Sequence, residues 1–424
     1  SFWLDTLAPS ASRVTPAPSA VDYAIVGAGF TGLSAARALA LRGASVAVLE
    51  QHDVAWGASS RNGGMVLTGL KVEATALLAK YGAERARRLF ATSLASIDCV
   101  ERIVRDEAID CAFARCGHAE VASKPAHFDA MRRTAETLAD RFDHRVHVVY
   151  PKYMAGVVAS HAYHGALIDD ASASVNPARL ATGMAEAARR RGAVILEQTR
   201  VDAIDRSDHD GSRGFTIETQ RGKLRAGAVL VATGAYMFTP WIKRRVIPVG
   251  SYVIATEPLG AAATADLIPG ARMIFDSNHF LHYYRLTPDR RMLFGGRAAF
   301  FPAGDRTTRE SAAILQRDMI AAFPQLRDAR IAYAWGGTID FTFDQLPHAG
   351  MQDGLYYAVG YAGHGVAMAT LVGERVAAAM LGDIAVSDVL ATGPLPPPPP
   401  GLSGDAPWFL PLAGAWYRLL DWAS

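Results

Sequence analysis

The chain has 424 residues, of which half are hydrophobic and a fifth are charged, so we expect a globular protein. Its length allows a large core and favours two domains over one. The formal net charge of +2 gives no support for nucleic acid or an anionic membrane surface as a partner.

Cysteine content and the lack of long apolar runs indicate the cellular setting. Cys99, Cys111 and Cys116 are odd in number and lack metal-site spacing, so we interpret them as reduced thiols and predict no bound metal. Residues 1–20 lack a signal-peptide pattern, and no run approaches the ~18 apolar residues of a membrane span. We therefore expect a cytoplasmic protein without a membrane span.

A strand, a glycine turn and a helix open the first domain. Residues 21–26 are apolar, as in a buried strand, and residues 33–42 are rich in alanine, as in a helix. The next strand, 45–49, ends in Glu50, close to the spacing of ~20 residues at which an acidic side chain binds a ribose hydroxyl.

The turn itself carries three glycines with separate purposes. Gly27 allows a sharp turn, Gly29 lets a pyrophosphate approach the backbone, and Gly32 lets the helix pack closely on the sheet. Free N–H groups at the helix start favour a diphosphate. The combination predicts binding of an adenine dinucleotide.

A second run of small residues, Trp56 to Met65, follows the Glu50 strand. Such a run lets the backbone approach a ligand, and Arg61 suits a phosphate or a flavin edge. We expect this loop to form a second part of the cofactor site.

The next segments indicate an insertion and then a return to the first sheet. Residues 73–107 have helical spacing of apolar residues, and strand-like runs at 119–122 and 146–150 flank a helix that begins after Pro125. Asn176 then suits the N-cap of a helix that leads to a strand at 193–196, as in a continuing parallel sheet.

The remaining strands divide between the two domains. A strand ends in the small residues 232–235, which allow close approach to the cofactor. Beyond Pro240, strands at 252–256, 281–286 and 292–297 are interrupted by few helices, which predicts an antiparallel sheet for the substrate domain.

A third glycine turn lies near the C-terminus. The strand 355–359 leads to Gly363-His364-Gly365 and a helix to Met380, so a second helix N-terminus points at a ligand and suits negative charge on a reduced flavin. Residues 396–400 form a polyproline spacer, and we expect residues 408–422 to form a helix docked on the protein surface.

Together these motifs resemble the FAD-dependent amine and D-amino-acid oxidoreductase family, in particular its branch of gamma-glutamylputrescine oxidases. The motifs are the first glycine turn with Glu50, the Arg61 loop, Asn176-Pro177-Ala178-Arg179-Leu180, Ala232-Thr233-Gly234-Ala235 and Gly363-His364-Gly365. Supporting the branch are Tyr284-Arg285-Leu286, residues 293–297, Trp335-Gly336-Gly337 and the start of the chain.

The resemblance implies non-covalent FAD, and an amine held between the flavin and the antiparallel sheet. Carbon–hydrogen oxidation would deliver a hydride to the flavin, the imine would hydrolyse, and oxygen would regenerate the flavin with release of hydrogen peroxide. The implied fold is α/β, with a Rossmann-like FAD-binding domain and an inserted α+β substrate domain on an antiparallel or mixed sheet.

Three departures from the family pattern bear on the substrate. Relatives that act on free amino acids carry an arginine at the position of Ile339, to bind the α-carboxylate. Relatives similar to sarcosine oxidase carry a lysine at the position of Ala367 and a flavin-linking cysteine near Trp335. No lysine stands at Leu293 or Phe294, near where some relatives keep an oxygen-activating lysine, so oxygen as the acceptor is inferred from the family alone.

The expected site residues fall into two groups. Those expected at the substrate are His364, Tyr252, Trp335, Tyr284, His282 and Arg297, although packing on a sheet face explains all but His364 at least as well. Those expected at the cofactor are Gly27, Gly29, Phe30, Thr31, Gly32, Glu50, Gln51, Gly57, Ala58, Ser59, Arg61, Asn62, Gly63, Gly64, Met65, Val201, Thr233, Gly234, Gly363, His364, Gly365 and Val366.

The leading hypothesis is a flavin-dependent oxidase of a primary or secondary alkylamine, with gamma-glutamylated amines among the candidates. Alternatives are a D-amino-acid dehydrogenase, an NAD-dependent dehydrogenase and a flavin-holding subunit of a larger dehydrogenase. The predicted domains are 21–80, 165–240 and 335–390 for FAD, 81–164 and 241–334 for substrate, with a lead-in at 1–20 and a tail at 391–424. The oligomeric state and the identity of the amine stay open.

Overall fold

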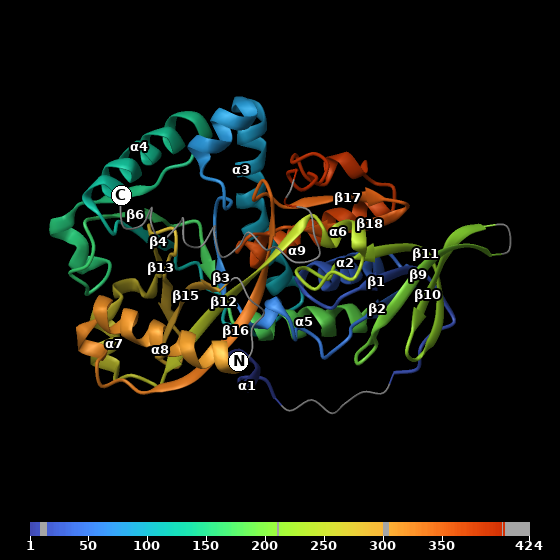
Figure 1. Ribbon diagram of the computed structural model, residues 1–424, viewed down its shortest axis with the longest axis horizontal. Helices are drawn as coiled ribbons and strands as arrows, with labels where there is room; N and C mark the ends of the chain where they lie inside the picture. The colour runs from blue at the N-terminus through green and yellow to red at the C-terminus, as the bar shows by residue number, and fades with distance from the viewer. Residues whose placement is uncertain (9–14, 210–211, 300–304, 401, 403–424) are drawn as a thin grey trace.

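The computed structural model describes residues 1–8, 15–209, 212–299, 305–400 and 402, and it contains two large sheets. One sheet lies among α2, α5 and α9, and the other lies beneath α4 and above α7 and α8 in the orientation of Figure 1. The predicted C-terminal helix at 408–422 lies outside the described residues.

The first sheet is the parallel sheet that the glycine turn predicted. Its strand order is β17-β18-β11-β1-β2-β8, parallel except for β17, and β10 and β9 extend it beside β11. The strands are β1 (Ala20–Val26), β2 (Val46–Leu49), β8 (Val194–Leu196), β9 (Val201–His209), β10 (Ser212–Thr219), β11 (Gly222–Val231), β17 (His348–Gln352) and β18 (Leu355–Val359).

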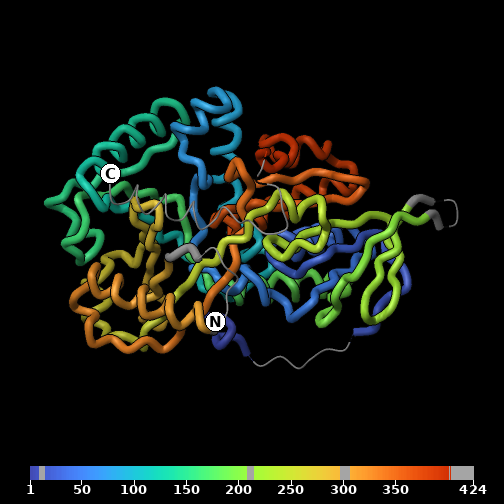
Figure 2. The backbone as a smooth tube through the Cα atoms, viewed as in Figure 1, coloured from blue at the N-terminus to red at the C-terminus, as the bar shows by residue number. Residues whose placement is uncertain are grey.

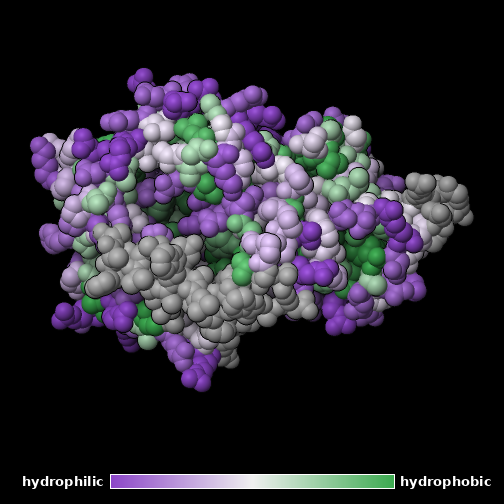
Figure 3. All heavy atoms as spheres, turned by 45° about the horizontal axis from the view of Figure 1, so that its top comes forward, coloured by the Kyte–Doolittle hydropathy of each residue, from purple (hydrophilic) through white to green (hydrophobic). Residues whose placement is uncertain are grey.

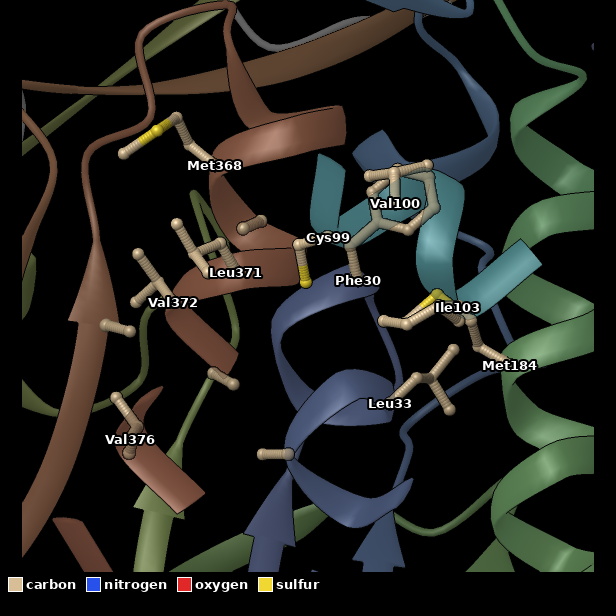
Figure 4. Packing of buried hydrophobic residues seen from close by; sticks show 14 of the residues in the cluster. Phe30, Leu33, Cys99, Val100, Ile103, Met184, Met368, Leu371, Val372 and Val376 are labelled. Carbon is tan, nitrogen blue, oxygen red and sulfur yellow. The ribbon is translucent and has the colours of Figure 1, made fainter. Parts of the chain in front are cut away.

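Four helices pack together beside this sheet to form the largest core. They are α2 (Phe30–Leu41), α3 (Ala74–Asp106), α5 (Pro177–Arg190) and α9 (Gly365–Met380). Leu33 of α2, Val100 of α3, Met184 of α5 and Val372 of α9 are all buried in it (Figure 4). The core fixes the starts of α2 and α9 relative to the sheet edge.

Local signals explain where two of these helices begin and bend. The Asn176 side chain accepts a hydrogen bond from the Arg179 N–H, so it caps α5 as predicted. The predicted long helix is α3, and Gly82 at φ 74° kinks it near its start.

The second sheet is mixed, with the order β16-β12-β15-β14-β13-β4-β6-β5, and only β13 and β4 pair in parallel. Its strands are β4 (His118–Val121), β5 (His147–Val149), β6 (Ala166–Asp169), β12 (Val246–Thr256), β13 (Met273–Asp276), β14 (Tyr283–Leu286), β15 (Met292–Ala299) and β16 (Ile331–Thr342). A small third sheet pairs β3 (Met65–Val66) with β7 (Ala173–Ser174). The predicted fold class is confirmed.

Few helices interrupt the strands at 252–256, 281–286 and 292–297, as expected, since α7 is the one α-helix among them, but the helix and the strand that follow were missed. Helices α6 (Pro240–Lys243), α7 (Ala261–Leu267) and α8 (Asp305–Ala322) lie from Pro240 onward, and residues 331–342 form a strand that the sequence analysis did not identify. The physical reason is the topology, because β15 and β16 both pair antiparallel with β12 and therefore run in the same direction. The chain must cross back between them, and α8 makes that crossover.

Contacts between distant segments join the two sheets. The N-terminal helix α1 (Phe2–Asp5) lies beside β16, where the Phe2 and Tyr333 rings are 5.4 Å apart (Figure 2). Helix α4 (Pro125–Phe142) covers β5 and β6.

The domain boundaries stay a prediction. Among the described helices, none is both long and apolar enough to cross a bilayer.

Candidate active site

A cavity of about 1230 Å³ lies where the two sheets meet. Its walls include the carboxyl ends of β1, β2 and β11, which is where open α/β sheets bind ligands. The surface is hollowed there, with apolar atoms visible in the depression (Figure 3). The volume exceeds the ~300–1,000 Å³ of ordinary ligand pockets, so a cofactor and a substrate fit together.

The first glycine turn lies at one end of this cavity. Gly27 has φ +105°, and a Cβ there would lie 2.6 Å from the Ala232 carbonyl oxygen, so strand β11 closes directly on the turn. Helix α2 has no side-chain cap at Gly29. The Phe30 N–H donates to Ser59 Oγ, and the other N–H groups of the first turn are available to an anion.

Glu50 and Ser59 order the backbone around the turn. Glu50 Oε2 accepts a hydrogen bond from the Ala28 N–H at 2.8 Å, and Ser59 Oγ accepts one from the Phe30 N–H at 3.1 Å. Glu50 therefore stands at the end of β2 beside the turn, in the position that the motif requires of a ribose ligand.

The loop from Gly57 to Gly64 is held by donors from three distant parts of the chain. Its carbonyl oxygens accept as follows: Ser60 from Ser1 Oγ at 2.9 Å, Arg61 from Trp335 Nε1 at 3.0 Å, Asn62 from Trp3 Nε1 at 2.8 Å and Gly64 from Arg285 Nη1 at 2.8 Å. The loop is therefore fixed by α1, β14 and β16 together.

His364 is the N-cap residue of α9 and lines the same cavity. Its Nδ1 is buried and has no hydrogen-bond partner among the described residues. Burial, reinforced by the positive charge of Lys71, lowers the pKa of His364 to about 4. The imidazole is therefore neutral at physiological pH and leaves one ring nitrogen free for a ligand.

Most residues expected at the cofactor line this one cavity. They are Gly27, Gly29, Phe30, Thr31, Glu50, Gln51, Gly57, Ala58, Ser59, Arg61, Asn62, Gly63, Met65, Val201, Thr233, Gly234, Gly363, His364, Gly365 and Val366. Three features fit a dinucleotide. They are a turn with no room for a Cβ at Gly27, a helix start with free N–H groups and the His364 Nδ1 without a protein partner. Individual cofactor contacts stay predictions.

Gly32 and Gly64 do not line the cavity, and both are needed for packing. A Cβ on Gly32 would lie 2.0 Å from the Gly27 carbonyl oxygen, and one on Gly64 would lie 2.2 Å from that of Val175. These glycines let other backbone segments approach the cofactor loops.

Three comparisons with known proteins bear on this geometry. A model of the family described as FAD dependent oxidoreductase matches residues 22–379. The chain belongs to the FAD-dependent oxidoreductase family. It is 31% identical over 404 residues to gamma-glutamylputrescine oxidoreductase of Escherichia coli, covering 94% of this chain and 92% of that protein.

A second relative and a solved structure are also similar to this FAD-dependent oxidoreductase. It is 33% identical to the probable oxidoreductase OrdL of Haemophilus influenzae over 85% of this chain and 83% of that protein. Its fold matches the crystal structure of glycine oxidase from Geobacillus kaustophilus with a TM-score of 0.74 at 23% identity, covering 89% of this chain and 100% of the other. The predictions of family, of an oxidoreductase and of FAD as cofactor are confirmed.

Four of the six residues expected at the substrate lie outside the cavity walls of this oxidoreductase. Tyr252 and Tyr284 are buried in the core on the other face of the second sheet, where Tyr284 stacks on Phe294 with centroids 5.4 Å apart. Trp335 is buried with Phe2 and Trp3, and holds the loop rather than facing the cavity.

His282 and Arg297 complete that set. Although burial alone would lower it, hydrogen bonds to Asp276 and Asp318 raise the pKa of His282 to about 9, so this side chain forms a structural ion pair. The side chain of Arg297 lies outside the described residues. Of the five whose side chains the structure describes, only His364 lines the cavity.

Sequence reasoning missed several cavity residues. Tyr283, Phe275, Glu120, His118 and Lys71 line the half of the cavity beside the second sheet. They come from three strands and one loop, and only their cross-strand pairing brings them together. No local motif marks them.

Proposed function

We propose that this enzyme oxidises a primary or secondary alkylamine, with gamma-glutamylated amines among the candidates, to an imine that water converts to an aldehyde. For a primary amine the overall reaction is R–CH2–NH2 + O2 + H2O → R–CHO + NH3 + H2O2. FAD, when bound, supplies the acceptor for the two electrons and the hydrogen of the C–H bond beside the amine nitrogen.

The observation that carries the proposal is the lack of a free arginine in the described cavity wall. Arg61 donates to the carbonyl oxygens of Trp56 at 2.8 Å and Gly336 at 3.2 Å, and Arg200 pairs with Asp202. Ile339 of β16 lines the cavity. By the resemblance described above, relatives that act on free amino acids carry an arginine at this position. A carboxylate on the carbon that bears the reacting nitrogen therefore finds no bidentate partner, whereas an alkyl chain whose carboxylate is distant or absent finds an apolar wall.

The chain's own residues would bind and orient the amine. Tyr283, Phe275 and Ile339 supply apolar surface for the alkyl carbons. His364, being neutral, accepts a hydrogen bond or a proton at its free Nδ1. This role of His364 stands as a proposal together with the cofactor contacts of the three glycine turns.

The names of two relatives support an amine substrate. The relative from Escherichia coli is named for gamma-glutamylputrescine, an amine, and the structural neighbour from Geobacillus kaustophilus is named for glycine. The arginine observation favours the first kind of substrate. A D-amino-acid dehydrogenase and a flavin-holding subunit are the alternatives that the experiment must separate.

The test is turnover by the purified holoenzyme with a panel of n-alkylamines, gamma-glutamylated amines and D-amino acids. We expect stoichiometric peroxide and aldehyde from the alkylamines in air. Turnover of D-alanine alone, with an artificial electron acceptor and no peroxide, would support the dehydrogenase instead. Absence of peroxide release from any amine would support the subunit.

We also propose the cytoplasm as the location, oxygen as the acceptor, and the two-domain division predicted from the sequence. The three cysteines are free thiols, and Cys99 and Cys111 are buried with their pKa values raised to about 12 by burial. Protonated, buried thiols fit a reducing compartment. Fractionation of the native host with a peroxide assay tests the location and the acceptor together.

A further inference from the structure

Four residues that line the cavity form one row across the second sheet. Leu167 of β6 pairs with Glu120 of β4, Glu120 pairs with Phe275 of β13, and Phe275 pairs with Tyr283 of β14. Directly paired residues in a sheet point to the same face. Within this row of four, Glu120 is therefore the one carboxylate among aromatic and aliphatic side chains.

The row also sets the distance between Glu120 and the loop from Gly57 to Gly64. Tyr283 is at the loop end, because a Cβ on Gly63 would lie 3.0 Å from its ring. Strands β14 and β4 are separated by β13, which amounts to two inter-strand steps, or about 10 Å. Glu120 thus faces the part of the cavity that lies away from the loop.

The Glu120 carboxylate has no hydrogen-bond partner, and the charges around it affect its pKa. Its carboxylate makes no hydrogen bond to any described side chain or backbone group, whereas the Asp276 carboxylate beside it is engaged by His282 at 2.9 Å. Burial, and then the charge of Glu73, raise the pKa of Glu120 to about 7, against the opposing charge of Lys71. A partly buried carboxylate left unpaired in this way is stabilised by any cation that reaches it.

We propose that Glu120 binds a second ammonium group of the substrate, so that the preferred amines are those with a positively charged nitrogen at each end. The inference rests on the proposed function, because the first nitrogen is the one oxidised at the flavin. The alkyl chain between the nitrogens lies along Tyr283 and Phe275. The Phe275 ring beside Glu120 also favours a cation through its π face.

The surrounding charges favour an ammonium over a carboxylate at this end. Glu73, Glu120 and Asp276 all act on this region, and Asp276 is balanced by His282. Lys71 is the remaining cation there, and burial lowers its pKa. A substrate carboxylate would have to rely on Lys71 alone while standing close to two unpaired carboxylates.

The test compares binding of α,ω-diamines, from putrescine to diaminooctane, with n-alkylamines of the same carbon number. The holoenzyme is first reduced with dithionite, so that ligand binding is measured by calorimetry without turnover. We expect the best diamine to bind at least about tenfold more tightly than its matched monoamine, as for a charge-assisted hydrogen bond. Binding near pH 7 should also release protons as Glu120 ionises.

Two variants assign the effect to one carboxylate. Glu120→Gln should abolish the preference for diamines, with the flavin spectrum as evidence that the fold is intact. Glu136→Gln removes an equal charge from the exposed side of α4, away from the cavity lining, and should leave the preference within about twofold, because a solvated charge contributes little.

The outcomes separate this inference from the proposed function. Equal binding of diamines and monoamines, or a preference that survives Glu120→Gln, overturns the inference. Tighter binding of amines with a distal carboxylate, lost in Lys71→Met, overturns it as well. A preference that depends on Glu120 without flavin reduction by any amine supports the inference and contradicts the proposed function.

Discussion

The indole Nε1 of Trp335 donates a hydrogen bond to the carbonyl oxygen of Arg61 at 3.0 Å, across 274 positions of sequence. This contact ties strand β16 of the second sheet to the glycine-rich loop of the first. Because Trp3 donates to the next carbonyl, that of Asn62, two indoles hold successive peptide groups of one loop. The loop follows a strand of the first sheet, and a strand of the second sheet helps to hold it in place.

The first prediction concerns this contact. Trp335→Phe keeps an aromatic ring but removes the N–H, so the loop should hold FAD less well. We expect the dissociation constant of FAD, measured by fluorescence titration of the apoprotein, to rise about 2–10-fold, as for the loss of one hydrogen bond. Trp241→Phe is the control, since Trp241 packs on Tyr357 away from the loop. Equal affinities of the two variants would contradict this role.

A second prediction concerns Gly27. In Gly27→Ala the new Cβ would meet the Ala232 carbonyl oxygen at 2.6 Å, and backbone cannot yield as a side chain can. We expect purified Gly27→Ala protein to lack FAD and to melt well below the wild type. Gly43→Ala shares a positive φ but has open space around its Cβ, so it should lose only the ~1–3 kcal/mol of backbone strain and retain FAD. Retention of FAD by Gly27→Ala would rule out the tight turn.

The third prediction is a pH dependence of stability from Glu120. Burial, then the Glu73 charge, raise its folded pKa from 4.5 to about 7, so between these values the folded state binds more protons than the unfolded state. Stability from this group therefore falls as pH rises through that window. Glu120→Gln should be more stable than wild type by about 2–3 kcal/mol above the folded pKa and equal to it in acid.

Thermal melts across the pH range check this prediction, with Glu136→Gln as the exposed control. A difference between Glu120→Gln and wild type that is the same in acid and base would mean that Glu120 is not the titrating group.

A fourth prediction concerns His364. Burial, then the charge of Lys71, lower its pKa to about 4, so the neutral imidazole persists above that pH. The rate of flavin reduction by amine should show no step near pH 6.5 from this residue, and His364→Ala should slow that rate about 100-fold through loss of its proton-handling nitrogen. Stopped-flow absorbance provides the rates. A histidine-like step in the wild type that vanishes in the variant would contradict the neutral state.

Sequence reasoning succeeded where the signal is local. The turn at Gly27 and the Asn176 cap depend on neighbours a few residues away, and both lie in the structure where the pattern indicated. It failed where a choice of strand face was needed. Tyr284 was expected at the substrate, but its neighbour Tyr283 lines the cavity, since successive side chains point to opposite faces.

Long-range pairing explains the remaining misses. Glu120 enters the site because β4 pairs with β13, and the two strands are more than a hundred residues apart along the chain. Trp335 was expected to touch the substrate, but its indole in the twelve-residue strand β16 of the second sheet donates to the Arg61 carbonyl oxygen and supports the loop. No pattern within either segment contains that information.

The most direct test of amine oxidation in this cavity is anaerobic reduction of the bound flavin in a single turnover. An n-alkylamine or diamine should bleach the flavin, and the amine deuterated at the carbon beside the reacting nitrogen should do so more slowly. Flavin that stays oxidised with every amine but is bleached by D-alanine would contradict the account.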